Sequence, residues 1–220
     1  NAPLKPSGID WLGDIPAHWE VKRLKYLCDL YPSVNFTHLA EDDEITFLPM
    51  DRVKDGYYLQ NLSPLKKFSS SYSAFAEGDI VLAKVTPCFE NGNIAIAENT
   101  KNGLGFGSSE LFVIRPFSMD RMFAFYYLRN LLFKQKGEAS MTGAGGLKRV
   151  SPEMLLGHHL AIPDIKEQEA ISKHLNGAIN RMTRVEATIQ KSIDLLTEYR
   201  SALITATVTG QTDVERGQMC

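Results

Sequence analysis

Residues 161–175 read AIPDIKEQEAISKHL, and the chain changes its character within this stretch. Pro163 disfavours helix in the residue before it, and the side chain of Asp164 can cap a helix that starts at about Ile165. From there to about Val208 the chain has no proline, a single glycine at Gly177, and many good helix formers. The stretch therefore predicts one unbroken helix of about 40 residues.

Apolar residues recur along this helix at alternating gaps of four and three, the a/d pattern of a coiled coil. We call these positions the seam: Ile171, Leu175, Ala178, Met182, Val185, Ile189, Ser192, Leu196, Tyr199, Leu203 and Ala206. Only Ser192 interrupts the apolar pattern, and Ile193 beside it can partly compensate. A rod of roughly 60 Å is longer than a compact domain of about 160 residues, which is roughly 30–35 Å across. This length favours a partner helix along the seam over packing along the chain's own domain.

The chain before Pro163 is rich in strand patterns. Short β-branched or alternating runs, separated by turn formers, lie at 45–50, 79–85, 93–98 and 110–116. A helical segment at about 120–134, a glycine-rich loop at 141–150, a short helix from Ser151 and a last strand at 158–163 follow. The sequence predicts an α+β fold: a strand-rich mixed globular domain, 1–163, then the long coiled-coil helix, 164–208, and a flexible tail, 209–220.

The composition is that of a folded protein with an ordinary core, since 44% of the 220 residues are hydrophobic and the formal net charge is −2. Cys28, Cys88 and Cys220 are widely spaced and form no metal-ligand pattern, so we expect reduced thiols and no metal site. The sequence shows no secretory signal and no apolar run of membrane length. We therefore expect a cytoplasmic protein with no membrane partner.

The patterns of common catalytic sites are missing from the sequence. It contains no GxSxG, HExxH or Walker motif. The glycines of GLGFGSSE, 103–110, precede a strand, whereas a phosphate loop follows one, so we expect a hairpin or bulge there. The acidic run 41–44 is typical of a solvated loop. His158 and His159 alternate across a strand, which indicates two ordinary histidines rather than a catalytic or metal pair.

A local excess of positive charge favours nucleic acid as a partner. Between Arg121 and Val150 the chain has six basic residues and one acid, a net charge of +5. The glycine-rich loop adds backbone that can approach DNA closely, and a second polar loop at 83–93 adds side chains that can contact base edges. The candidate DNA-binding residues are Lys84, Thr86, Asn91, Asn93, Thr142, Gly143, Gly145, Gly146, Lys148 and Arg149. A surface helix with scattered lysines and a tight turn is the alternative interpretation.

Five segments together resemble the specificity subunit of type I restriction-modification systems. They are SGIDWLGDIPAHWEVKRLKYL (7–27), GDIVLAKVTPCFENGNIAIA (78–97), GFGSSELFVIRP (105–116), LAIPDIKEQEAISKHL (160–175) and YRSALITATVTGQTDV (199–214). The resemblance spans the chain in order. It implies that 1–163 is a DNA target-recognition domain for one half of a bipartite site, and that 164–208 is a spacer helix. Full-length members of this family hold two such domains and two antiparallel helices.

This chain departs from that pattern, because it has one domain and one helix. A natural half-subunit and a truncated subunit both fit. We expect the seam to pair with a second copy or with another half-subunit, as a two-fold antiparallel dimer. The resemblance also implies partners: methyltransferase subunits that use S-adenosylmethionine and restriction subunits that use ATP, while this subunit catalyses nothing and binds neither cofactor directly. A coiled-coil scaffold without DNA function and a recognition fragment of a single-chain adenine methyltransferase stay open.

Overall fold

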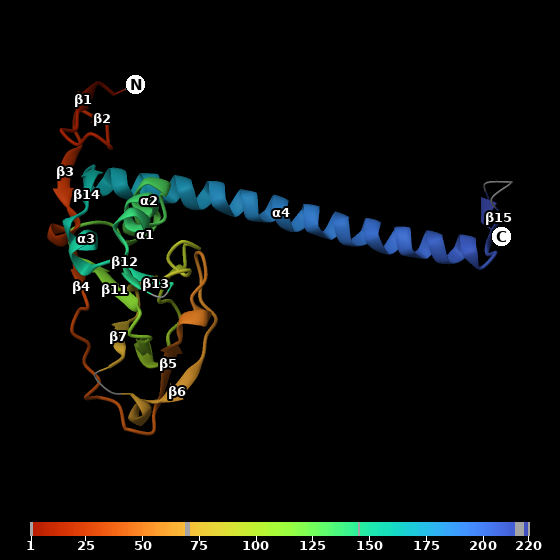
Figure 1. Cartoon of the computed structure of the whole chain (residues 1–220), viewed down its shortest axis with the longest axis horizontal. Helices are drawn as coiled ribbons and strands as arrows, with labels where there is room; N and C mark the ends of the chain where they lie inside the picture. The colour runs from red at the N-terminus through yellow and green to blue at the C-terminus, as the bar shows by residue number, and fades with distance from the viewer. Residues whose placement is uncertain (1, 69–70, 145, 214–217, 220) are drawn as a thin grey trace. The chain divides into compact units, whose positions relative to one another are not determined.

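The structure, a computed structural model, describes residues 2–68, 71–144, 146–213 and 218–219 (Figure 1). The chain divides into two compact units, 1–172 and 173–220. The first unit holds the strands and short helices that precede the long helix α4 (Ile165–Val208), together with the first two turns of α4. The second unit holds the rest of α4 and the chain end.

The central sheet of the first unit has the strand order β4-β11-β8-β9 and is buried on both faces. Its strands are β4 (Cys28–Leu30), β8 (Ile80–Ala83), β9 (Ile94–Ile96) and β11 (Leu111–Pro116). Successive side chains of β11 alternate between two hydrophobic clusters, with Phe112 and Ile114 in one and Leu111 and Val113 in the other. Because both faces are covered, these strands are nearly continuous apolar runs, which is why the sequence reveals them.

A second sheet and a helical layer cover the two faces. The second sheet has the order β6-β5-β10-β7, with β5 (Glu44–Leu48), β6 (Leu62–Pro64), β7 (Ser73–Ala76) and β10 (Leu104–Gly107), and it supplies Leu48 and Phe75 to one cluster. Helices α1 (Arg121–Leu128), α2 (Leu131–Ser140) and α3 (Pro152–Gly157) supply Phe123, Phe133 and Leu155 to the other. In Figure 1 these helices lie at one end of the first unit and β5 and β6 at the other.

Three local expectations differ from the structure. The helix expected over 120–134 is two helices, because the Asn130 side chain accepts a hydrogen bond from the Phe133 amide and caps α2. The loop expected at 141–150 contains a hairpin, β12 (Thr142–Ala144) with β13 (Leu147–Arg149). Of the glycines at 103–110, Gly105 and Gly107 belong to strand β10 rather than to a hairpin or bulge, while Gly103 ends the 3-10 turn before it, and a Cβ at Gly105 would lie 2.3 Å from the Phe75 ring.

Short strand pairs complete the chain. They are β1 (Leu4–Pro6) with β2 (Asp14–Pro16), β3 (Glu20–Arg23) with β14 (His159–Ile162), and β15 (Thr212–Asp213) with β16 (Gln218–Met219). Part of the tail predicted over 209–220 lies outside the described residues. In the parts of the chain that the structure describes, no helix combines the length and apolarity that a bilayer crossing requires. The predicted α+β class, with its long C-terminal helix, is confirmed.

Helix α4 starts and ends where its sequence signals place it. The carboxylate of Asp164 accepts a hydrogen bond of 2.9 Å from the Glu167 amide and so caps the helix. In the first two turns, Gln168 and Ser172 are buried and bond to Asp120, which itself caps α1. Hydrogen bonds among Asp120, Gln168 and Ser172 thus connect the start of α1 to the first two turns of α4.

Candidate nucleic-acid interface

The hairpin β12–β13 lies against residues 84–86, so two segments about 60 positions apart in the sequence form one surface. The Thr86 amide donates to the Lys148 carbonyl at 3.0 Å, and the Val150 amide donates to the Lys84 carbonyl at 2.8 Å. The Thr86 hydroxyl donates to the Gly146 carbonyl at 2.8 Å and accepts from the Lys148 amide at 3.0 Å. The structure therefore brings together Lys84, Thr86, Lys148 and Arg149 from the predicted set.

The glycines of the hairpin have structural reasons to be there. Gly143 has φ +147°, and a Cβ at this position would lie 2.2 Å from the Leu147 carbonyl oxygen. Gly146 has φ +82° and open space around it. Thr142 is exposed at the start of the hairpin, and Gly145 lies outside the described residues. The hairpin needs Gly143 for its own closure, whether or not that residue contacts a ligand.

Arg149 forms a two-bond ion pair with Glu110, the residue directly before β11. The guanidinium Nε lies 2.9 Å from one carboxylate oxygen, and Nη2 lies 2.6 Å from the other. The hydrogen bond from Arg149 holds the pKa of Glu110 below its usual range, and the carboxylate raises the pKa of Arg149 in return. Both groups are therefore charged at neutral pH, and the guanidinium is held in one orientation.

Lys84 lies beside the same carboxylate and is partly buried among aromatic rings. Its ammonium donates to the Tyr31 hydroxyl at 3.2 Å and lies 5.5 Å from the centre of the Phe112 ring. Burial lowers the pKa of Lys84, and burial raises the pKa of Tyr31 to about 12. Tyr31 has φ +55°, a left-handed conformation that is uncommon outside glycine. We call Tyr31, Lys84, Glu110 and Arg149 the polar cluster.

The two asparagines of the second loop do not join this cluster. Asn91 lines a cavity of about 120 Å³ with Asp55, Arg129 and Lys134. In that group Arg129 donates to the Asp55 carboxylate at 2.8 Å. The backbone of Asn93 donates to the Cys88 carbonyl at 3.0 Å and accepts from the Ala83 amide at 2.9 Å, which closes the turn after β8. Asn91 thus lies with Arg129, directly after α1, and with Lys134 of α2.

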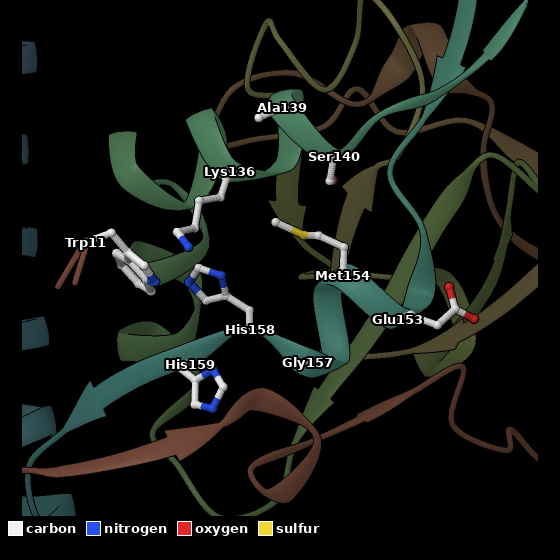
Figure 2. A pocket seen from close by; sticks show the side chains of 9 residues that line it. All are labelled: Trp11, Lys136, Ala139, Ser140, Glu153, Met154, Gly157, His158 and His159. Atoms are coloured by element: carbon white, nitrogen blue, oxygen red, sulfur yellow. The ribbon is translucent and has the colours of Figure 1, made fainter. Parts of the chain in front are cut away.

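The adjacent histidines lie beside a larger cavity of about 480 Å³. Figure 2 shows the His158 ring on the side of Trp11 and Lys136, and the His159 ring on the opposite side of the chain. The ring of His158 is hydrogen-bonded to the Tyr127 hydroxyl at 3.1 Å, and burial lowers its pKa to about 4. His158 is therefore a neutral histidine of the core. Among the described residues, no group of three His, Cys, Asp or Glu side chains could hold a metal ion.

The seam positions differ in their surroundings along α4. Ile171 packs against the core of the first unit, so this position is already used within the chain. Leu175, Ala178 and Ala206 are half-buried. The other positions are exposed: Met182, Val185, Ile189, Ser192, Leu196, Tyr199 and Leu203. Exposed apolar residues also flank the seam at Ile193 and Leu195, so the apolar surface is wider than the sequence pattern predicts.

A family model described as type I restriction modification DNA specificity domain matches residues 16–195. The chain belongs to this family. The matched range covers most of the first unit and α4 as far as Leu195. The resemblance of the chain to this family is thus confirmed.

Relatives from Escherichia coli support the specificity-domain assignment. The specificity subunits of the type I restriction enzymes EcoAI and EcoEI are 31% and 30% identical to this chain over 92% of its length. The aligned regions cover 35% and 34% of those proteins, so the chain spans about a third of their length.

Solved structures share the fold. The HsdS subunit from Thermoanaerobacter tengcongensis matches 83% of this chain and 48% of its own, with a TM-score of 0.64 and 19% identity. A structure from work on assembly and conformational transition of the type I R-M system matches 88% of this chain and 46% of its own, with a TM-score of 0.67 and 16% identity.

Glu110 and Tyr31 are two residues of the polar cluster that the sequence did not indicate. Both lie in or near segments that the resemblance includes, but a glutamate after two serines and a tyrosine in a loop carry no local signal of a shared site. Their partners, Arg149 and Lys84, are 39 and 53 positions away. Pairing in the central sheet brings Tyr31, Lys84 and Glu110 together, and the bridge between Val85 and Arg149 adds the fourth residue.

Proposed function

We propose that this chain is a DNA-binding module that recognises one half of a bipartite double-stranded DNA site. The observation that carries the proposal is the surface formed by the hairpin and residues 84–86 in a member of the DNA specificity family. Lys84 and Arg149 converge there on one carboxylate, that of Glu110, and Lys148 adds an exposed cation on the same hairpin, which leaves a net positive surface. Cations on exposed backbone are what phosphate and base contacts require.

The same proposal includes the division of the chain and its lack of catalysis. We assign 1–163 to target recognition, 164–208 to the spacer helix and 209–220 to a tail. The methyltransferase and restriction subunits would supply the chemistry, with S-adenosylmethionine and ATP bound by those partners. The names of the E. coli relatives, which are specificity subunits of restriction enzymes, support this role.

The exposed seam supports assembly with a second copy of the chain. Seven seam positions of α4 are exposed in the single chain. An antiparallel pair of α4 helices would cover the seam of both copies by two-fold symmetry. The 44 residues of α4 make a rod of about 66 Å, which is long enough to hold two recognition domains one to two DNA turns apart.

The test is the methylation pattern of a methylation-free host that expresses this chain as its only specificity subunit, together with the methyltransferase subunit of the same system. We expect a gapped, inverted-repeat methylated motif, because a two-fold dimer places the same recognition surface on each half. A gapped motif with two different halves would replace the homodimer with pairing to another half-subunit. The absence of any new motif would contradict the proposed DNA-specificity function.

A further inference from the structure

In the polar cluster, the guanidinium of Arg149 is held in one orientation by two hydrogen bonds to one carboxylate. Glu110 binds the edge of the Arg149 guanidinium formed by Nε and Nη2, with one oxygen on each nitrogen. The guanidinium has five N–H groups, so the edge formed by Nη1 and the second N–H of Nη2 stays available. Within the described chain, Nη1 of Arg149 makes no hydrogen bond, and the side chain is 44% exposed.

The backbone around this ion pair is fixed by neighbouring strands. Arg149 pairs with Thr142 across the hairpin and forms a bridge with Val85 on the other side. The Lys84 amide donates to the Glu110 carbonyl at 3.0 Å, so the segments that carry the carboxylate and both cations are hydrogen-bonded to one another. The free edge of the guanidinium is therefore held on a rigid frame, as a contact that discriminates between bases requires.

Resting on the proposed DNA-binding function, we propose that Arg149, oriented by Glu110, recognises a guanine in the major groove of the half-site. The free edge presents two parallel N–H groups, which match the O6 and N7 acceptors of guanine. A phosphate is the poorer ligand, because the Glu110 carboxylate cancels much of the arginine charge and repels a phosphate. Guanine is uncharged and is not repelled in this way.

Lys148 is the natural comparison, since it precedes Arg149 on the same strand. Its side chain is exposed, and no described residue pairs with its ammonium. An ammonium on a flexible stem acts as a point charge rather than as a planar fork. Lys148 is therefore suited to phosphate, and Arg149 to a base.

The experiment selects bound duplexes from a random pool with the full chain and compares three variants: Arg149→Lys, Glu110→Gln and Lys148→Gln. The dissociation constant is then measured for the selected duplex and for its single-base-pair replacements. A bidentate arginine–guanine contact discriminates by about ten- to hundredfold. We expect Arg149→Lys and Glu110→Gln to lose this preference at the same G·C pair and to keep the rest of the motif. Lys148→Gln should weaken all duplexes by one common factor.

The outcomes separate this inference from the function on which it rests. If the wild-type chain selects a motif and Arg149→Lys selects it with the same preference at every position, the guanine assignment is wrong while DNA recognition stands. Equal weakening at all positions by Arg149→Lys, like that by Lys148→Gln, would assign Arg149 to phosphate and also overturn the inference. If the wild-type chain selects no motif, both proposals fail. Thermal melting of each variant identifies any variant that fails to fold. A folding defect would weaken binding to every duplex and would not abolish the preference at a single base pair.

Discussion

Replacing Leu196 with glutamate should convert the proposed homodimer into monomers. Leu196 is a seam residue that is 67% exposed in the single chain. Full burial of a leucine contributes about 1.5–3 kcal/mol, so about two thirds of this, roughly 1–2 kcal/mol, is available to a partner helix. In a two-fold dimer each copy contributes one Leu196, which doubles the stabilisation to about 2–4 kcal/mol.

The substitution Leu196→Glu removes this contribution and also places an unpaired carboxylate in the seam of each copy. Taking an unpaired ion out of water costs several kcal/mol. The combined loss exceeds about 4 kcal/mol, which raises the dimer dissociation constant by at least about a thousandfold. Sedimentation velocity over a range of chain concentrations measures this constant directly.

The matched control is Thr197→Glu, which adds the same charge one residue further along α4. Thr197 is exposed and turned about 100° around the helix from Leu196, away from the seam. We expect this variant to dimerise like the wild-type chain. A dimer of undiminished affinity in Leu196→Glu, or equal dissociation in both variants, would refute the seam assignment.

Three further predictions concern the first unit. Lys148→Gln should reduce the slope of log affinity against log salt by about 0.9, as expected for one phosphate contact, in DNA titrations at several salt concentrations. Burial keeps the pKa of His158 in the folded chain below that of a histidine in the unfolded chain. Between these two pKa values the unfolded state binds a proton that the folded state does not, so the free energy of unfolding falls as the pH drops. Urea unfolding of the wild-type chain should show that the free energy of unfolding falls by about 2 kcal/mol between about pH 7 and pH 5, and His158→Gln should remove this fall. An equal pH dependence of the unfolding free energy in both proteins would contradict the assignment of His158 as a buried neutral histidine. Gln168→Ala should lower the free energy of unfolding by about 2–4 kcal/mol, because the Asp120 amide and the Pro163 carbonyl lose their hydrogen-bond partner. The matched control Glu169→Ala, at an exposed position, should lower it little. Equal losses in both variants would refute the stabilising role of the Gln168 side chain.

The elements that the sequence predicts correctly depend on local signals or on complete burial. Helix α4 begins at Ile165 because Asp164 caps it, and no proline interrupts it before Val208. Strands β8 and β11 are recognisable because both of their faces are covered, so few polar residues interrupt them. In each case the signal that predicts the element lies in the residues of the segment itself.

The features that the sequence predicts poorly have an ambiguous local signal or depend on partners far along the chain. The break between α1 and α2 has a local signal, since Asn130 lies three residues before Phe133, but the aromatic residues on both sides suggest one continuous helix. The polar cluster has no such signal. Arg149 is basic in any interpretation, but its orientation depends on Glu110, and only the folded sheet supplies that contact.

The two units make separable contributions to the proposed function. All residues of the polar cluster lie in the first unit, and all exposed seam residues lie in the second. A monomer made by Leu196→Glu should therefore keep the base preferences of one half-site. It should lose the gain that comes from linking two recognition domains, which is about 10²- to 10⁴-fold for two linked binding modules. A duplex with two half-sites should thus lose affinity by this factor, whereas a duplex with one half-site should bind as before, so that specificity belongs to the first unit and avidity to the helix.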